Sequence, residues 1–352
     1  MARVRVLGPC AAETQDVRRP NRGPVMTQPG KVLVLGGTGH YGRHIVAGLE
    51  AKGVPVRVLT RSAVRARGSL PRTVEFTQGD LVSREDVARA LHDVDRVVVA
   101  VSAFTRGQIR KMGAIEREAV IAALDEAEAA GVKRVVYISV FDIRPEIPAR
   151  LHLDSARIKQ DVERYLQSSD FDWTILGAPP SMEVFFAMMR GDRMVVPGGG
   201  PKAVPTISPV DLGEIAAQAV LRDDLGGRRV RLAGPELLSF PEAAKRLSAV
   251  YGKTIRFTAI PLILPKIAWH ATWPLARFSR SLDYVHTILG FAQLLNAFPQ
   301  DLALASVEDH ANLVRTFSYT PTTLEMEARR RRSRRIGRLA VYAPLYRGRG
   351  GP

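Results

Sequence analysis

Three glycines spaced three residues apart constrain this chain more than any other feature. Gly36, Gly39 and Gly42 follow the apolar run 31–35 and open a segment with helical periodicity at 40–52. In such a strand–turn–helix, the first glycine permits the tight turn, the second lets the backbone approach a pyrophosphate, and the third lets the helix pack against the strand. The helix start offers N–H groups and a positive dipole end to phosphates. The motif predicts a dinucleotide site formed by Gly36, Thr38, Gly39, His40, Tyr41 and Gly42.

Short apolar segments and helical segments alternate after this turn. Strands are expected at 56–60, 74–77, 96–101, 134–139 and 173–176, and helices at 83–91, 108–130 and 153–167. The strands are continuous β-branched runs, which indicates a sheet buried on both faces. Repeated strand–helix alternation predicts parallel strands joined by right-handed crossovers. We therefore expect an α/β fold, a doubly wound parallel sheet of the Rossmann type.

The pattern loosens after Gly177, and the domain boundaries follow from that change. Residues 31–254 are expected to form the Rossmann domain, including parts of a substrate lobe from about residue 178. Residues 255–327 carry long apolar helices and predict a smaller, mostly helical lobe or lid at the carboxyl edge of the sheet. Asp211 is expected to cap a helix at 211–221, and Ser239 with Glu242 to form the capping box of a helix reaching Val250.

The net charge of +16 is concentrated at the two ends of the chain. Residues 328–352 hold nine arginines and no acidic residue, and residues 1–30 hold five arginines against two acidic residues, which leaves about +4 between them. We expect a disordered N-terminal arm at 1–30 and a solvated basic tail at 328–352. The segment Arg329–Arg335 is expected to contact anionic surfaces weakly at most, without specific recognition of nucleic acid.

Cysteine usage and hydropathy favour a cytoplasmic location. Cys10 is the single cysteine, which excludes a disulfide framework within the chain. Two prolines and a lysine interrupt the longest apolar stretch, 259–268, so that no membrane span is expected. The first 30 residues do not resemble a secretory signal, and Met26, just before the first strand, is an alternative start to Met1. The sequence leaves the oligomeric state undetermined.

The end of the second strand indicates which dinucleotide binds. An NAD site usually has a carboxylate there for the ribose 2′-hydroxyl, whereas an NADP site has an arginine. Arg61 follows this strand, and no acidic residue lies between Glu50 and Glu75. A guanidinium can hold the 2′-phosphate through forked, charge-assisted hydrogen bonds. NADP(H) is therefore expected rather than NAD(H), unless Arg61 only faces solvent.

Two further strand ends are expected to border the dinucleotide. Asp80 and Leu81 follow the third strand, where an adenine would rest, although Asp80 is equally suited to cap the next helix. Val101 and Ser102 end the fourth strand and should border the nicotinamide ribose.

Together these motifs resemble the NmrA-like branch of the atypical short-chain dehydrogenases/reductases. The sequences at 136–139, 163–166, 172–176, 207–212 and 233–240 strengthen the resemblance, which covers about residues 31–258. It implies that Lys159 reaches the nicotinamide ribose and that Pro179 contacts the cofactor. Two departures stand out. The sixth strand lacks the arginine usual before this proline, and the Tyr-x-x-x-Lys pair of the superfamily is absent, with Ser155 four residues before Lys159.

Candidate catalytic residues are Lys159, His152 and Ser139. His152, Ser155 and Lys159 share one helix face. A partly desolvated Lys159 would have a lowered pKa and could act as an acid. His152 is an alternative proton donor, and Ser139 could hydrogen-bond a carbonyl group. Equally, Lys159 could only hold the ribose and His152 only cap its helix.

The sequence predicts an NADP(H)-dependent reductase of a small carbonyl compound or quinone. The missing tyrosine favours a second hypothesis, a redox-sensing regulator that binds NADP without turnover. A third is an assembly or scaffold protein that uses residues 255–298 and the arginine-rich tail. Hydrolase chemistry is not expected, because the chain lacks a Gly-x-Ser-x-Gly elbow. No metal site is expected, because His40 and His44 have no evident third ligand.

Overall fold

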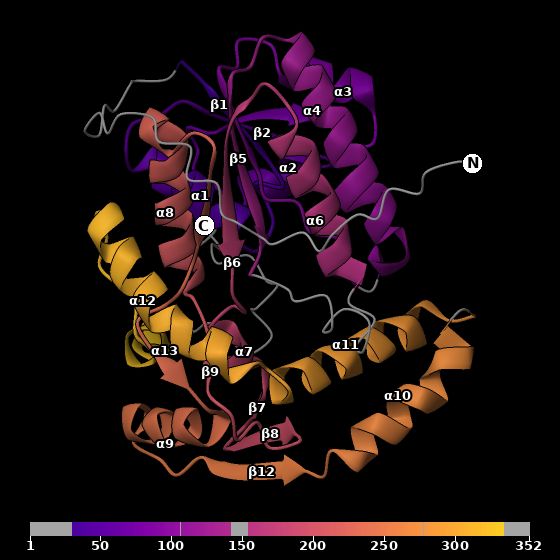
Figure 1. The fold of residues 1–352 in the computed structure, drawn as a ribbon, viewed down its shortest axis with the longest axis vertical. Helices are drawn as coiled ribbons and strands as arrows, with labels where there is room; N and C mark the ends of the chain where they lie inside the picture. Colours follow the sequence, from indigo (N-terminus) through magenta and orange to yellow (C-terminus); the bar gives the residue numbers. More distant parts are fainter. Residues whose placement is uncertain (1–29, 106, 142–153, 277, 334–352) are drawn as a thin grey trace, which may run out of the picture.

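A seven-stranded parallel sheet forms the centre of the molecule. The computed structural model describes residues 30–105, 107–141, 154–276 and 278–333. The strand order is β10–β6–β5–β4–β1–β2–β3, and every neighbouring pair is parallel (Figure 1). The strands are β1 (Val32–Leu35), β2 (Val56–Thr60), β3 (Glu75–Gln78), β4 (Arg96–Val99), β5 (Arg134–Val140), β6 (Asp172–Ala178) and β10 (Arg228–Arg231). The predicted doubly wound Rossmann sheet is confirmed.

Helices cover both faces of the sheet, as the continuous apolar strands require. One face packs against α1 (Gly42–Glu50) and α8 (Pro209–Leu221), and the other against α3 (Arg84–Ala90), α4 (Ala119–Ala129) and α6 (Asp154–Gln167). The residues of β1 alternate between the two cores: Val32 and Val34 join the first, and Leu33 and Leu35 the second. A short helix, α2 (Ala63–Arg67), follows β2. Each strand is thus buried on both sides.

The helix expected at 108–130 is present, but it is not a regular α-helix throughout. It consists of a 3-10 turn, η1 (Ile109–Lys111), a π-helical turn, η2 (Ala114–Glu118), and α4. A π turn accommodates one extra residue within a helix and is frequent at functional sites. Hydrophobic periodicity does not reveal such a turn, because the apolar stripe continues on either side of it.

The start of α8 differs from the expectation. Ser208, not Asp211, is the N-cap: its hydroxyl accepts from the backbone N–H of Val210 at 3.2 Å, and Pro209 occupies the first turn, where its missing N–H is harmless. The buried carboxylate of Asp211 instead accepts from the backbone N–H and the hydroxyl of Thr322, at 2.8 and 2.5 Å. Asp211 therefore ties α8 to the C-terminal part of the chain.

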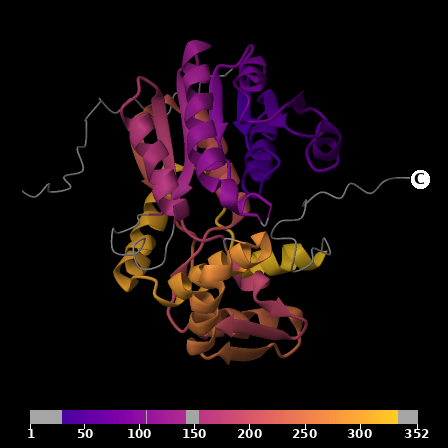
Figure 2. The ribbon, with the colours of Figure 1, turned by 90° about the vertical axis from the view of Figure 1, so that its right-hand side faces the viewer.

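A second lobe lies at the carboxyl ends of the strands (Figures 1 and 2). Residues 255–327 of this lobe are mostly helical, as predicted. The lobe also contains a three-stranded sheet of β7 (Met189–Arg190), β8 (Arg193–Pro197) and β12 (Arg256–Ile260), and a pair of strands, β9 (Val204–Pro205) and β11 (Leu237–Leu238). Its helices are α7 (Glu183–Ala187), α9 (Phe240–Tyr251), α10 (Ile263–Ala276), α11 (Arg280–Asn296), α12 (Gln300–Thr316) and α13 (Leu324–Ser333). Ser239 and Glu242 form the expected capping box at the start of α9. The lobe has its own core around Phe185, Phe240 and Phe298.

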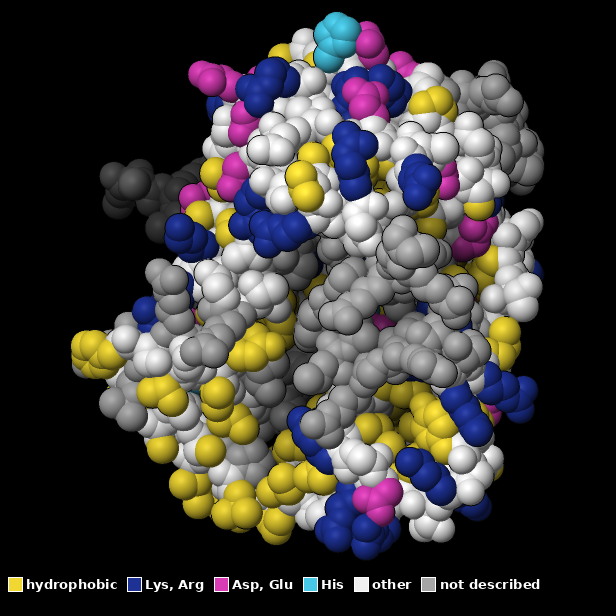
Figure 3. All heavy atoms as spheres, turned by 180° about the vertical axis from the view of Figure 1, so that it is seen from behind, with side chains coloured by type: hydrophobic (Ala, Val, Ile, Leu, Met, Phe, Trp, Pro, Cys, Tyr) yellow, Lys and Arg dark blue, Asp and Glu magenta, His cyan; other side chains and the backbone are white. Residues whose placement is uncertain are grey.

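The outer surface of α10 is apolar. Ile263, Leu264 and Ile267 are each more than half exposed, and hydrophobic side chains gather over this part of the lobe (Figure 3). The same helix packs against α11, and the two helices run side by side (Figure 1). Among the described helices, none combines the length and the apolar character needed to cross a bilayer.

The basic segment at the C-terminus is partly buried along its described part. Residues 324–333 form α13, in which Ala328 is fully buried and Arg331 is 3% exposed. The expectation of a solvated tail from residue 328 is therefore wrong for Ala328 and Arg331, because Arg331 finds carboxylate partners inside the lobe, whereas Arg329 and Arg332 are exposed. Residues 334–352, residues 1–29 of the expected N-terminal arm and the predicted donor His152 lie outside the described residues.

Candidate active site

A cavity of about 1990 Å³ lies between the carboxyl ends of the strands and the lobe. It opens where the strand order reverses, between β1 and β4, which is the usual ligand crevice of an open α/β sheet. Its volume exceeds the roughly 300–1,000 Å³ of a small-ligand pocket. It therefore has room for a dinucleotide and a second molecule. The cavity brings together these predicted residues: Gly36, Thr38, Gly39, His40, Tyr41, Arg61, Asp80, Leu81, Val101, Ser102, Ser139, Lys159 and Pro179.

The glycine turn forms one wall of this cavity. Gly36 has a φ of +82°, and a Cβ atom there would lie 2.5 Å from the carbonyl oxygen of Ala100. Gly42 lies behind the cavity wall, where a Cβ atom would approach the carbonyl oxygen of Gly36 to 2.1 Å. No side chain caps the start of α1 at Tyr41. A backbone cradle at an uncapped helix start fits the diphosphate of a dinucleotide.

The end of β2 presents two arginines to the cavity. Arg61 and Arg65 both line it, and within the described part of the chain neither guanidinium has an ion-pair partner. Ser62, between them, caps α2 by accepting from the backbone N–H of Arg65 at 3.4 Å. Two unpaired cations beside the expected ribose position fit a phosphorylated nucleotide.

Asp80 does not cap the helix that follows it. Ser83 is the N-cap of α3 and accepts from the backbone N–H of Asp86, while Asp80 accepts from the backbone N–H of Val82 at 3.4 Å. The helix-cap alternative for Asp80 is therefore wrong. Asp80 and Leu81 both remain on the cavity wall.

Lys159 projects from α6 into the cavity and is held as a cation. Its Nζ lies 3.1 Å from a carboxylate oxygen of Glu116, 3.3 Å from the carbonyl oxygen of Val101, and 5.5 Å from the ring centre of Tyr137. Burial alone would lower the pKa of Lys159, but the neighbouring Tyr137 and the ion pair with Glu116 raise it above its ordinary value. The prediction that burial lowers the pKa of Lys159 is therefore wrong. Lys159 is suited to hold hydroxyl groups and poorly suited to give up a proton.

Glu116 is a site residue that sequence reasoning missed. It lies on the π turn η2 and is only 2% exposed. One oxygen pairs with Lys159, and the other accepts from the backbone N–H of Ala103 at 2.5 Å. It thereby joins the loop after β4 to the lysine. The sequence carries no signal for this contact, because a regular helix at 108–130 would not predict the π turn that holds Glu116.

Ser139 has a different partner from the expected carbonyl group. Its hydroxyl donates to Glu163, whose carboxylate also pairs with Arg229 at 2.8 Å. Ser139 lines the cavity but is almost completely buried. Because its proton is used within the protein, Ser139 is not placed to donate to a substrate in this geometry.

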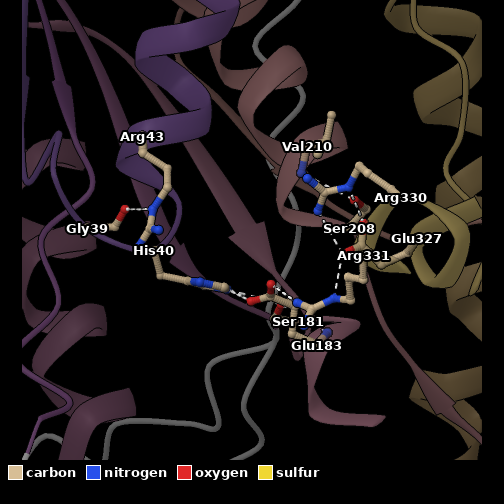
Figure 4. Close-up of polar contacts among 10 residues, drawn as sticks. All are labelled: Gly39, His40, Arg43, Ser181, Glu183, Ser208, Val210, Glu327, Arg330 and Arg331. Atoms are coloured by element: carbon tan, nitrogen blue, oxygen red, sulfur yellow. Dashed lines mark hydrogen bonds and ion pairs between the residues drawn. The ribbon is translucent and has the colours of Figure 1, made fainter. Parts of the chain in front are cut away.

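A chain of polar contacts runs from the glycine turn to the C-terminal helix (Figure 4). Nε2 of His40 lies 3.0 Å from Glu183 and 3.2 Å from the hydroxyl of Ser181. Glu183 also accepts from Arg331, whose Nε donates to Glu327 at 2.8 Å. Burial raises the pKa of Glu183 to about 7 and outweighs the opposing attraction of Arg331. The sequence motif predicted His40 as a cofactor contact but gave no indication of this second role.

Metal ligation finds no support in the described part of the chain. No three His, Cys, Asp or Glu side chains there are grouped to hold an ion. His40, one of the two histidines considered as ligands, instead faces the carboxylate of Glu183.

Comparison with known proteins agrees with this geometry. A family model described as NAD(P)H-binding matches residues 36–223. An NAD(P)H azoreductase from Xenophilus azovorans is 30% identical over 66% of this chain and 77% of its own length. A photosystem II assembly factor, Ycf39 of Guillardia theta, is 26% identical over 76% of this chain and 83% of its own length. The fold is similar to that of Citrobacter sp. triphenylmethane reductase complexed with NADP(H), with a TM-score of 0.63, 17% identity, and coverage of 85% of this chain and 99% of that one.

Proposed function

Because this chain belongs to the NAD(P)H-binding family, within the NmrA-like atypical short-chain dehydrogenases/reductases, we propose that it is an NADP(H)-dependent reductase of a small carbonyl compound or quinone. One observation carries the proposal. A single cavity contains the glycine turn, the cation of Lys159 and a further space walled by the lobe. A cofactor and an acceptor would therefore meet in one place shielded by α10 and α11.

Three groups of residues would hold the cofactor. The backbone of residues 36–42 would receive the diphosphate, Arg61 and Arg65 the 2′-phosphate, and Lys159 the hydroxyls of the nicotinamide ribose. The unpaired state of Arg61 and Arg65 among the described residues supports NADP(H) over NAD(H). When bound, the reduced nicotinamide supplies a hydride. The protein's own part is to orient the two reactants, to exclude water and to provide a proton.

Two measurements test this function. Calorimetry should register binding of NADPH, with NADH at least about tenfold weaker, because only NADPH carries the phosphate that the arginines can hold. A panel of quinones and enones should then oxidise NADPH, followed by the absorbance of the reduced nicotinamide. Binding of neither nucleotide to folded protein would refute the cofactor assignment.

A second function is favoured by one specific feature, the absence of the Tyr-x-x-x-Lys pair. A protein that binds NADP without turnover, as a redox sensor or an assembly factor, would give calorimetric heat but no oxidation of NADPH with any acceptor. Turnover that is lost in Lys159→Ala would instead support the reductase.

A further inference from the structure

The space beyond Lys159 is walled by aromatic side chains from two parts of the chain. Phe104, from the loop after β4, lies 6.4 Å from Tyr284 of α11, measured between ring centres. Trp269 of α10 stacks on His286 of α11 at 4.8 Å with an interplanar angle of 14°. All four residues line the cavity. Flat aromatic walls favour a flat, conjugated ligand, because π faces stack in offset or edge-on arrangements.

Ion pairing holds this part of the lobe over the Rossmann domain. Arg110, on the 3-10 turn η1, lies 3.2 Å from Asp283 of α11. Asp283, His286, Thr287 and Gly290 lie at positions i, i+3, i+4 and i+7 of one helix face, and all line the cavity. One face of α11 therefore looks toward the loop after β4, which also carries the carbonyl group bound by Lys159.

The hydrogen bonds around His286 define which ring nitrogen carries a proton. Its Nδ1 lies 3.0 Å from the carbonyl oxygen of Trp269, an atom that can only accept. Nδ1 also lies 3.1 Å from the hydroxyl of Thr272, which donates to the backbone carbonyls of Ala268 and Trp269, at 2.8 and 3.0 Å, and so can accept from the ring. Nδ1 is thus the protonated nitrogen of the neutral ring. Any second proton goes to Nε2, which can release it again.

Two groups considered as proton donors, Ser139 and Lys159, are already engaged, and the third, His152, lies outside the described residues. Ser139 donates to Glu163, and Lys159 is ion-paired with Glu116. A hydrogen bond from Nδ1 to a backbone carbonyl that fixes the tautomer is the usual support of a histidine in acid–base catalysis. His286 has this support and lies on the wall of the cavity.

We propose that His286 is the proton donor of the reaction, and that the space between Phe104, Trp269 and Tyr284 binds a flat conjugated acceptor such as a quinone. The proposal rests on the proposed reductase function. The acceptor gains two electrons and one hydrogen as hydride from the reduced nicotinamide, which is oxidised. The Nε2–H bond of His286 breaks, and its proton forms a new bond with the acceptor oxygen on which negative charge develops. The neutral ring then takes a proton from water.

The variant His286→Phe tests the proton step, because phenylalanine keeps the stacking on Trp269 and removes the exchangeable proton. With the quinone that turns over fastest, kcat is expected to fall by at least about tenfold, since general acid catalysis contributes about 10²–10⁴-fold at sites that need it. In His286→Ala, which leaves space for a small base, added imidazole should restore part of the rate. An unchanged kcat in His286→Phe, or a fall in His286→Ala that imidazole does not relieve, would overturn the assignment.

A matched acceptor separates proton donation from a general structural role. A triarylmethyl cation becomes neutral on taking a hydride and needs no proton, so His286→Phe should reduce it at nearly the rate of the intact protein. An equal loss with both acceptors would show that His286 is only structural.

Ligand binding can be measured without any cofactor. Titration of the oxidised quinone should quench tryptophan emission saturably in the intact protein and in His286→Phe, and Trp269→Phe should lose most of the quenching. Retained quenching also shows that the histidine variant is folded. Absence of saturable quenching in the intact protein would overturn the aromatic binding space. Absence of turnover with every acceptor would refute the reductase function itself.

Discussion

Arg331 of α13 donates to the carboxylate of Glu183 of α7, across 148 positions of sequence. Both side chains are almost completely buried. The Nε atom of Arg331 also pairs with the carboxylate of Glu327 (Figure 4). Glu183 in turn faces His40 of the glycine turn. The C-terminal helix is therefore part of the folded unit, linked by two side chains to the turn expected to bind the cofactor.

Replacing Arg331 with methionine should destabilise the protein strongly. Methionine preserves much of the aliphatic packing but leaves the buried carboxylate of Glu183 without its arginine partner, a change that typically costs about 3–5 kcal/mol. Glu327 keeps its ion pair with Arg330. Urea unfolding followed by circular dichroism measures the difference. Arg332→Met, at an exposed position on the same helix, is the matched control and should change the free energy of unfolding by less than about 0.5 kcal/mol. Equal effects of the two substitutions would contradict the burial of Arg331.

The raised pKa of Glu183 predicts a pH dependence of stability. The pKa of Glu183 is 4.5 in the unfolded chain and about 7 in the folded protein. Between pH 4.5 and pH 7 the folded state therefore keeps a proton that the unfolded state has lost. This contribution is complete below about pH 4.5 and is lost as pH rises to about 7, by on the order of 3 kcal/mol.

The difference in the free energy of unfolding between the intact protein and Glu183→Gln isolates this contribution, because the contributions of the other titrating groups are nearly the same in both proteins and largely cancel. The free energy of unfolding of the intact protein, relative to the variant, should fall as the pH is raised from about 4.5 to about 7. Glu325→Gln, on α13, is the control and should show no such slope. A relative stability that rises with pH would mean that the pKa of Glu183 is lowered instead.

The parts of the fold that repeat a local pattern could be predicted from the sequence. The order of strands and helices follows from apolar periodicity, and the glycine turn from spacing alone. The contacts that were missed join positions far apart: Arg331 with Glu183, and Asp211 with Thr322. A run of arginines predicts a solvated tail, because the sequence does not show that a buried carboxylate, that of Glu183, pairs with one of them.

The residues of the candidate site also fall into those that the sequence could predict and those that it could not. Cavity-lining positions could be predicted, because they follow strand ends whose location the fold determines. The charge state of Lys159 could not, because it depends on Glu116, which a π turn brings to the lysine. His286 was missed because a histidine in an apolar helix carries no signal of its own; its tautomer depends on the backbone of a neighbouring helix.

Removing the charge of Glu116 should make cofactor binding depend on pH. In Glu116→Gln, Lys159 remains buried without its anionic partner, so its pKa should fall. The cation is then lost as pH rises, and the dissociation constant of NADPH should increase by about tenfold between about pH 7 and pH 9. The intact protein should show little change over this range, because the pKa of Lys159 is raised.

Calorimetric titration at several pH values measures this effect. Glu118→Gln is the control, since Glu118 is largely exposed and pairs with Arg117 instead. If Glu116 only stabilised the fold, its loss would weaken binding equally at every pH.

Arg61→Ala should remove most of the preference for NADP(H). The guanidinium faces the cavity without a competing carboxylate among the residues described, so a 2′-phosphate would be its natural partner. We expect NADPH to bind about tenfold more weakly and NADH to be nearly unaffected, because a charge-assisted hydrogen bond contributes about 1.5–3 kcal/mol. Arg72→Ala, at an exposed position outside the cavity lining, should leave both affinities unchanged. Equal weakening of the two nucleotides would exclude selection by Arg61.

Substituting alanine at Gly36 and at Gly53 distinguishes backbone strain from steric exclusion. Both glycines have positive φ values, +82° and +71°, so each alanine bears the cost of a left-handed conformation, about 1–2 kcal/mol. Only Gly36 would also place its Cβ against backbone, 2.5 Å from the carbonyl oxygen of Ala100, whereas Gly53 has open space around it. Gly36→Ala should therefore lower the free energy of unfolding more than Gly53→Ala does, by about 1–3 kcal/mol.

In calorimetry, Gly36→Ala should also weaken NADPH binding by at least about tenfold, because the displaced turn is the proposed phosphate cradle. Equal losses of stability with unchanged affinity would show that the close approach of β1 and β4 at this turn does not shape the site.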